Sequence, residues 1–86
     1  MPSGLPLVRL YERPDCHLCE EAAAELEEML AAGAGFELER IDIEADEGLL
    51  RRHLERIPVV VVDGEEVSEL WLDRVALEAR LATVAE

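Results

Sequence analysis

The two cysteines of the chain, Cys16 and Cys19, are separated by two residues. If a strand ends near Tyr11 and a helix begins near Cys16, both sulfurs lie on one side of the first helical turn. The unpaired backbone N–H groups and the positive end of the helix dipole favour a thiolate there over a thiol. A thiolate attacks disulfides, and Cys19 is near enough to resolve the resulting mixed disulfide. The spacing therefore predicts a redox-active pair.

Two other interpretations of the pair are inert buried thiols and half of a metal site. A closed zinc site needs four ligands, and the imidazoles that could complete it belong to His17 and His53. We expect His17 to point away from both sulfurs, so no metal ligand is predicted. We favour redox chemistry and keep, as the alternative, a non-catalytic module that docks a partner or carries a metal or an iron–sulfur cluster.

Three neighbours of the pair are candidates for tuning it. His17 either stabilises the thiolate as a cation or donor, or is a surface residue of the first turn. Arg13 is predicted to hold a substrate carboxylate and to favour the Cys16 thiolate, the alternative being a solvated loop arginine. Asp15 opposes ionisation of Cys16 unless it caps the helix.

The composition restricts the class of protein and its partners. With 86 residues, 50% hydrophobic and 34% charged, the chain is expected to form one globular domain over 1–86, with an ordered core at about 7–84. A net charge of −13 repels phosphates and anionic lipids, so we expect no nucleic acid and no membrane partner. We see no signal peptide at the N-terminus and therefore predict a cytoplasmic protein, which we expect to be a monomer. In the cytoplasm a cysteine pair is more often catalytic than structural.

Hydrophobic periodicity predicts the order β-α-β-α-β-β-α. A helix from Cys16 to Ala32 is indicated by an apolar stripe, which we expect to be core. The continuous valine run suits a central strand, and Asp63-Gly64 indicates a tight hairpin after it. The first two strands are expected to be parallel. The predicted elements are strands Leu7–Tyr11, Phe36–Ile43, Val59–Val62 and Glu65–Glu69, helices Cys16–Ala32 and Asp46–Leu54, a last helix capped by Asp73, and a stripe of Leu18, Ala22, Leu26, Met29 and Leu30.

This order, with Cys-x-x-Cys after the first strand and Ile57-Pro58 before the third, resembles the thioredoxin fold in its smallest, glutaredoxin-like form. The fold implied is α/β, with a four-stranded mixed sheet and three helices. Arg13-Pro14-Asp15-Cys16-His17-Leu18-Cys19 resembles the glutaredoxin pattern of a basic residue three positions before the nucleophile, and Ile57-Pro58 resembles its Val-Pro. The resemblance covers nearly all residues from Leu7 to Leu81.

The resemblance implies a dithiol–disulfide oxidoreductase that reduces protein or small-molecule disulfides. It implies Cys16 as nucleophile, Cys19 as resolving thiol and Pro58 as a cis-proline facing the sulfurs. The backbone of Ile57 would then pair with a substrate chain as a short extra strand.

The chain departs from the glutaredoxin pattern at the position of a Gly-Gly pair before the last helix, where Ser68-Glu69 stand instead. A carboxylate there opposes an anionic tripeptide. The sequence therefore predicts no bound cofactor, and it leaves glutathione and a thioredoxin-type reductase as alternative electron donors.

Two further groups of residues have open roles. The chain has a cluster of arginines at Arg51, Arg52 and Arg56. They form either a local anion-binding rim or ion pairs with acidic neighbours such as Glu47 and Glu55, and we favour the ion pairs. Among the aromatics, Tyr11 is a candidate wall of the site and Phe36 is expected in the core, while Trp71 is either a lid over the sheet edge or a contact surface. We expect His53 to be a packed or half-exposed helix residue.

Overall fold

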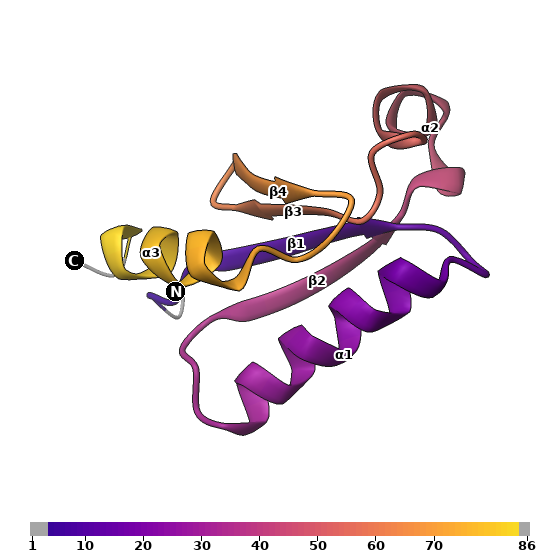
Figure 1. Ribbon diagram of the computed structural model, residues 1–86. Helices are drawn as coiled ribbons and strands as arrows, with labels where there is room; N and C mark the ends of the chain where they lie inside the picture. Colours follow the sequence, from indigo (N-terminus) through magenta and orange to yellow (C-terminus); the bar gives the residue numbers. More distant parts are fainter. Residues whose placement is uncertain (1–3, 85–86) are drawn as a thin grey trace.

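The computed structural model describes residues 4–84 and contains one mixed sheet with three α-helices around it (Figure 1). The sheet order is β2-β1-β3-β4, with β1 parallel to β2 and β3 antiparallel to β1 and β4. The predicted order of elements and the parallel first pair are confirmed. In chain order the elements are β1 (Leu7–Glu12), α1 (His17–Ala31), β2 (Glu37–Asp42), the 3₁₀ turn η1 (Ile43–Ala45), α2 (Glu47–His53), β3 (Val59–Val62), β4 (Glu65–Glu69) and α3 (Arg74–Val84).

The main hydrophobic core lies between the sheet and the helices α1 and α3. Alternation along a strand sends every second side chain to this face, which is where Val8, Leu10, Val60 and Val62 point. They pack against side chains of both helices, and Phe36 closes the cluster as expected. The helical members are Ala22, Ala23, Leu26 and Met29 of α1 and Leu77 of α3.

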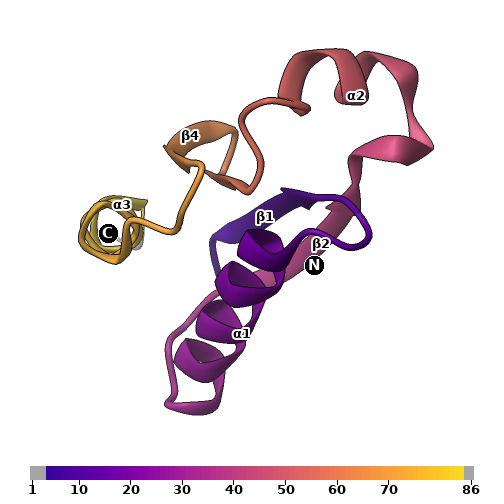
Figure 2. The ribbon, with the colours of Figure 1, turned by 45° about the vertical axis from the view of Figure 1, so that its right-hand side comes forward.

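The opposite face of the sheet carries α2, so α1 and α2 stand on different sides in both views (Figures 1 and 2). Tyr11, which pairs with Val59 across β1 and β3, stacks its ring on His53 of α2 at a centroid distance of 4.6 Å. His53 is only 6% exposed, which confirms that it is a packed residue.

The hairpin between β3 and β4 turns at Asp63 and Gly64, as predicted. Both residues have positive φ, 48° and 87°, which is the backbone that a two-residue hairpin turn of this kind requires. The Asp63 carboxylate also accepts the N–H of Leu7 at 2.9 Å. The turn therefore ties the hairpin to the start of β1.

Three sequence-based expectations need correction. Leu18 was assigned to the core stripe, but its side chain is 50% exposed, because it lies in the first turn of α1 where the sheet no longer covers the helix. The second strand ends at Asp42, and the buried Ile43 begins a 3₁₀ turn instead. Asp15 does not cap α1, because Cys16 occupies the N-cap.

Candidate redox site

Cys16 is itself the N-cap residue of α1. Its backbone is extended, with φ −103° and ψ 106°, and its Sγ accepts the backbone N–H of Cys19 at 3.2 Å. The preceding Asp15 has a φ of 61°, which turns the chain sharply between β1 and the helix. A sulfur thus takes the capping position that an oxygen usually fills, where orphan N–H groups and the helix dipole favour negative charge.

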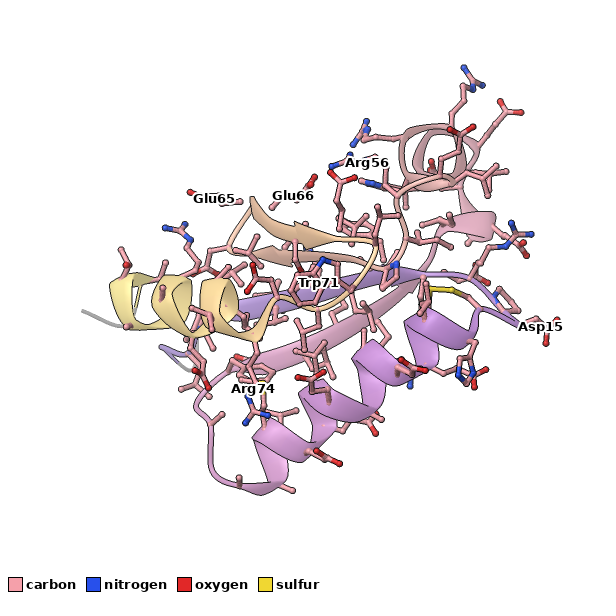
Figure 3. All side chains as sticks on the ribbon, viewed as in Figure 1. Asp15, Arg56, Glu65, Glu66, Trp71 and Arg74 are labelled. Atoms are coloured by element: carbon pink, nitrogen blue, oxygen red, sulfur yellow. A yellow bond between two sulfur atoms is a disulfide. The ribbon has the colours of Figure 1, made fainter. Side chains whose placement is uncertain are left out.

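Cys16 and Cys19 are joined by a disulfide, with their Cα atoms 5.2 Å apart (Figure 3). Cys16 is partly exposed, whereas Cys19 is fully buried. The predicted placement of both sulfurs on one side of the first turn is confirmed, and the structure represents the oxidised pair. The two sulfurs differ in access, because only one of them belongs to a residue that reaches solvent.

The Ile57–Pro58 peptide bond is cis, and Pro58 is fully buried. Pro58 directly precedes β3, whose first residue, Val59, is paired with Tyr11 near the end of β1. Antiparallel pairing therefore places Pro58 at the same end of the sheet from which the chain leaves β1 toward Cys16. The N–H of Ile57 donates to the carbonyl of His53 at 3.1 Å.

The structure places the other predicted site residues in ion pairs around α1. Arg13 donates to Glu44 of η1 at 2.7 Å, and the two side chains are about equally exposed. His17 Nε2 lies 2.7 Å from Glu21, one turn along α1, and its side chain is 84% exposed. This geometry corresponds to the surface alternative for His17, and the pairing of Arg13 with Glu44 was not predicted.

A hollow of about 270 Å³ lies beside the start of α1, between the loop before Cys16 and the ends of β1 and β2. Its walls include Glu12 and Arg40, which are joined by two hydrogen bonds of 2.6 and 2.9 Å. The bond to Glu12 raises the pKa of Arg40. The guanidinium of Arg40 therefore joins the ends of β1 and β2 at this hollow.

His53 was expected to be a packed helix residue, but sequence reasoning missed that its ring stacks on Tyr11 of β1. Burial lowers the pKa of His53, and the nearby Arg56 and Arg52 lower it further. Its Nδ1 is buried with no hydrogen-bond partner among residues 4–84. A neutral ring, stacked on Tyr11, is therefore favoured. The hydrophobic pattern places His53 on the inner side of α2 but cannot identify the ring it meets.

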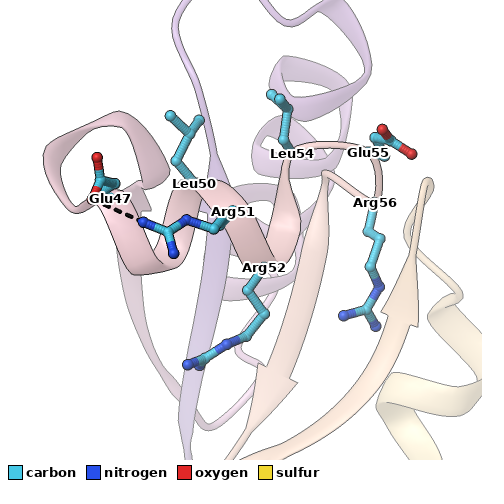
Figure 4. Close-up of a pocket in the computed structure, with 7 residues that line it drawn as sticks. All are labelled: Glu47, Leu50, Arg51, Arg52, Leu54, Glu55 and Arg56. Atoms are coloured by element: carbon cyan, nitrogen blue, oxygen red, sulfur yellow. Dashed lines mark hydrogen bonds and ion pairs between the residues drawn. The ribbon is translucent and has the colours of Figure 1, made fainter.

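Arg51 and Arg52 of α2, together with Arg56 of the segment that follows it, border an open hollow of about 610 Å³ (Figure 4). Arg51 pairs with Glu47 at 2.8 Å, as favoured from the sequence. Arg56 instead reaches across to β4, where it pairs with Glu66 and, at 3.4 Å, with Glu69. These hydrogen bonds, first with Glu66 and then with Glu69, raise the pKa of Arg56. The cluster is thus partly neutralised by ion pairs.

Residues 4–84 also lack the features of two other classes of protein. No group of three or more His, Cys, Asp or Glu side chains in this range is arranged to hold a metal ion. No helix within it is long and apolar enough to span a bilayer.

Solved structures similar to this one share the arrangement described above. A protein of Nitrosomonas europaea, determined by solution NMR, superposes with a TM-score of 0.78 at 35% identity, covering 90% of this chain and 92% of that one. A mutant thioredoxin of Halobacterium salinarum superposes with a TM-score of 0.67 at 22% identity, covering 94% of this chain and 75% of that one, which shows a shared fold. A protein of X. campestris superposes with a TM-score of 0.66 at 32% identity, covering 88% of this chain and 96% of that one. The predicted thioredoxin fold is confirmed.

Sequence relatives and a family model agree with this fold. An uncharacterised protein of Mycobacterium tuberculosis is 34% identical over 82 residues, covering 90% of this chain and 84% of its own, and one of Mycobacterium bovis matches equally. Residues 7–82 match the family described as Glutaredoxin-like domain (DUF836). With its Cys16–Cys19 disulfide at the start of α1 and this match over almost its whole length, the chain belongs to the family of glutaredoxin-like domains.

Proposed function

We propose that this chain is a thiol–disulfide oxidoreductase that reduces protein or small-molecule disulfides through Cys16 and Cys19. The observation that carries the proposal is the disulfide at the start of α1, with Cys16 partly exposed and Cys19 buried. An accessible sulfur at a helix N-terminus can attack a substrate, whereas a buried one can attack only its neighbour. Cys16 is therefore the nucleophile and Cys19 the resolving thiol.

The reaction begins from the reduced pair. The Cys16 thiolate attacks one sulfur of the substrate disulfide, whose S–S bond breaks, and the leaving thiolate takes a proton from water. The Cys19 thiolate then attacks Cys16 Sγ, which breaks the mixed disulfide and releases the second substrate thiol. Two electrons pass to the substrate, and the Cys16–Cys19 disulfide is the product. Glutathione or a thioredoxin-type reductase then supplies two electrons to restore the dithiol.

Ile57, Pro58, Arg13 and His17 are assigned to substrate binding. The Ile57 N–H is already used by the His53 carbonyl, so the Ile57 carbonyl is the group that would accept a hydrogen bond from an extended substrate segment. Arg13 would bind a substrate carboxylate by exchanging it for Glu44. This exchange costs little because exposed ion pairs contribute only about 0–1 kcal/mol.

Disulfide reduction with two electron donors tests the proposal. Insulin and a small neutral disulfide are offered in the presence of glutathione with its reductase, and separately with a thioredoxin-type reductase. We expect turnover with at least one donor, loss of turnover in Cys16→Ser, and accumulation of a mixed disulfide in Cys19→Ser. Thr83→Ala, on the exposed side of α3, is the matched control. A folded, reducible protein without turnover in either system would refute the proposal and favour the non-catalytic module. Colour and cysteine-dependent dimerisation under anaerobic conditions would then indicate an iron–sulfur cluster.

Alkylation of the reduced protein tests the assignment of roles. Cys16 should react faster than Cys19 with iodoacetamide at neutral pH, because Cys16 is accessible and caps the helix while Cys19 is buried. Peptide mapping by mass spectrometry measures both rates. Equal rates would contradict the division into nucleophile and resolving thiol.

A further inference from the structure

We propose that a hollow between α1 and the β4–α3 loop receives an arginine or lysine side chain of the disulfide-bearing protein substrate. The inference rests on the proposed oxidoreductase activity and names its substrate class: proteins with a basic residue close to the disulfide. The hollow is called the Trp71 hollow below. It is lined by Leu18, Glu21, Ala22 and Glu25 of α1 and by Trp71 and Leu72 of the loop.

The size of the Trp71 hollow suits one side chain. Its volume is about 160 Å³, which is below the roughly 300–1,000 Å³ of pockets that enclose cofactors or drug-sized ligands. The apolar residues Ala22 and Leu72 are 3% and 6% exposed and form its base. An occupant must therefore present a narrow apolar stem to this part of the hollow.

Two large apolar side chains at the Trp71 hollow are left open to solvent. Trp71 is 62% exposed and Leu18, which directly precedes Cys19, is 50% exposed. Figure 3 shows Trp71 standing on the loop that leads from β4 to α3. Exposed apolar side chains gathered around a hollow are typical of interaction sites. Of the two predicted roles of Trp71, the contact surface is the one this exposure favours.

The charge of the lining selects the occupant. Its six residues include two carboxylates, Glu21 and Glu25, and no cationic side chain. Both carboxylates have ion-pair partners outside the hollow: Glu21 lies 2.7 Å from His17, and Glu25 lies 4.0 Å from Arg74, so an arginine or lysine of a substrate would share or replace these contacts. The net charge of −13 adds a field that attracts basic partners and opposes anionic ones.

Arginine and lysine have the two properties that the Trp71 hollow requires. Their methylene stems cover apolar surface while the charged group stays at the rim, and the face of a tryptophan ring attracts a cation. A purely aliphatic residue would satisfy the base of the hollow but not Glu21 and Glu25. A glutamate would be repelled by both carboxylates.

Competition between disulfide peptides tests the inference on the full chain. Each peptide carries one intramolecular disulfide and one variable residue, which is arginine, norleucine or glutamate. The variable residue is placed in turn at each of the three positions before and after one cysteine. At the favoured position we expect kcat/KM for the arginine peptide to exceed that for norleucine by about threefold to tenfold. The glutamate peptide should be the poorest substrate.

Variants of the lining identify the cause of the preference. Trp71→Ala and the double change Glu21→Gln with Glu25→Gln should bring the arginine-to-norleucine ratio toward one. The double change Glu27→Gln with Glu28→Gln, an equal change of charge at exposed positions of α1 outside the hollow, should keep the ratio. Emission of Trp71, the single tryptophan, should change when the reduced arginine peptide binds Cys16→Ser. Circular dichroism verifies that each variant is folded.

The outcomes separate this inference from the proposed function. Equal kcat/KM for arginine and norleucine peptides at every position would overturn the inference while leaving the oxidoreductase activity in place. A preference that survives in Trp71→Ala and in the Glu21/Glu25 double variant would overturn the assignment to the Trp71 hollow. Absence of turnover with both the peptides and 2-hydroxyethyl disulfide, a small neutral disulfide, would refute the proposed function and the inference together.

Discussion

The sheet face covered by α1 and α3 is packed with a large aliphatic cluster, whereas the face beneath α2 combines a few buried side chains such as Val59 with one ring stack and ion pairs. On the first face Val8, Leu10 and Leu26 are fully buried. On the second, His53 stacks on Tyr11, and Arg56 reaches Glu66 across the sheet. The redox pair lies at the start of α1, which packs on the first face, whereas Pro58 follows α2, which lies on the second. The difference indicates that the nucleophile is rigidly positioned while the α2 side is the easier one to alter.

The largest contrast between the faces should come from shortening one leucine on each. Leu26→Ala removes a fully buried side chain from the α1 face and should lower the free energy of unfolding by about 2–5 kcal/mol. Leu54→Ala, 40% exposed next to α2, should cost less than about 1 kcal/mol. Urea denaturation measures both. Similar losses at the two positions would contradict the comparison.

A smaller effect is expected from removing the ring stack. His53→Ala deletes the ring that packs on Tyr11 and should cost about 1–2 kcal/mol, since stacking is lost but a buried unpaired Nδ1 is removed with it. His53→Phe is the matched control, because it keeps a ring without the unpaired nitrogen, and should retain or exceed the wild-type stability. Thermal unfolding separates the two variants. A phenylalanine variant as unstable as the alanine variant would show that the stack is not what holds α2.

The ion pairs of Arg56 should matter less still. Arg56→Met removes the contacts with Glu66 and Glu69 but keeps most of the aliphatic stem, so the free energy of unfolding should fall by no more than about 1 kcal/mol. The difference from wild type should shrink as NaCl is raised, because the pairs are partly exposed and screened. Urea denaturation at two salt concentrations tests this. A loss that is larger and independent of salt would place the pairs among the main supports of β4.

The pH dependence of stability should distinguish the faces with the smallest effect. Burial, then Arg56 and Arg52, lower the pKa of His53 below its ordinary 6.5, with Glu66 acting in the opposite direction. Above pH 6.5 the ring is neutral in both states. As the pH falls below 6.5 the unfolded chain takes up a proton before the folded one does, so stability is lost until the pH passes the folded pKa. Wild type should therefore lose stability relative to His53→Phe between pH 7.5 and 5.5.

The exposed His17 provides the control for that measurement. Its side chain is 84% exposed and it lies on α1, on the other side of the sheet from α2. His17→Gln should follow the pH profile of wild type more closely than His53→Phe does. If both variants change the profile equally, the pH effect does not come from the buried ring.

Features set by near neighbours in the chain were predictable from the sequence. The N-caps Asp46 and Asp73 accept the N–H groups of Leu49 and Ala76, at 2.9 and 3.1 Å, as their positions before apolar periodic segments indicated. The Cys16–Cys19 spacing likewise put both sulfurs on one turn. Each of these depends on geometry repeated within three or four residues, so no distant partner has to be known.

The surroundings of the redox pair were much less predictable. Arg13 was expected to be available to substrate, yet it is paired with Glu44, which lies in a turn that the hydrophobic pattern had assigned partly to a strand. Leu18 follows the helical stripe of the core residues but projects beyond the sheet. Periodicity identifies the inner side of a helix, but it cannot show where the surface beneath that helix ends.

The sequence by itself determined the order of the strands and helices, the tight turn at Asp63-Gly64 and the position of the cysteines at a helix start, because hydrophobic period, turn chemistry and capping act over short stretches of chain. Only the tertiary structure decided that Cys16 reaches solvent while Cys19 does not, that His53 meets Tyr11, and that Trp71 stands beside Leu18. These relations join segments that are distant in sequence. They are fixed by strand register and by how each helix lies on the sheet, which local preferences do not encode.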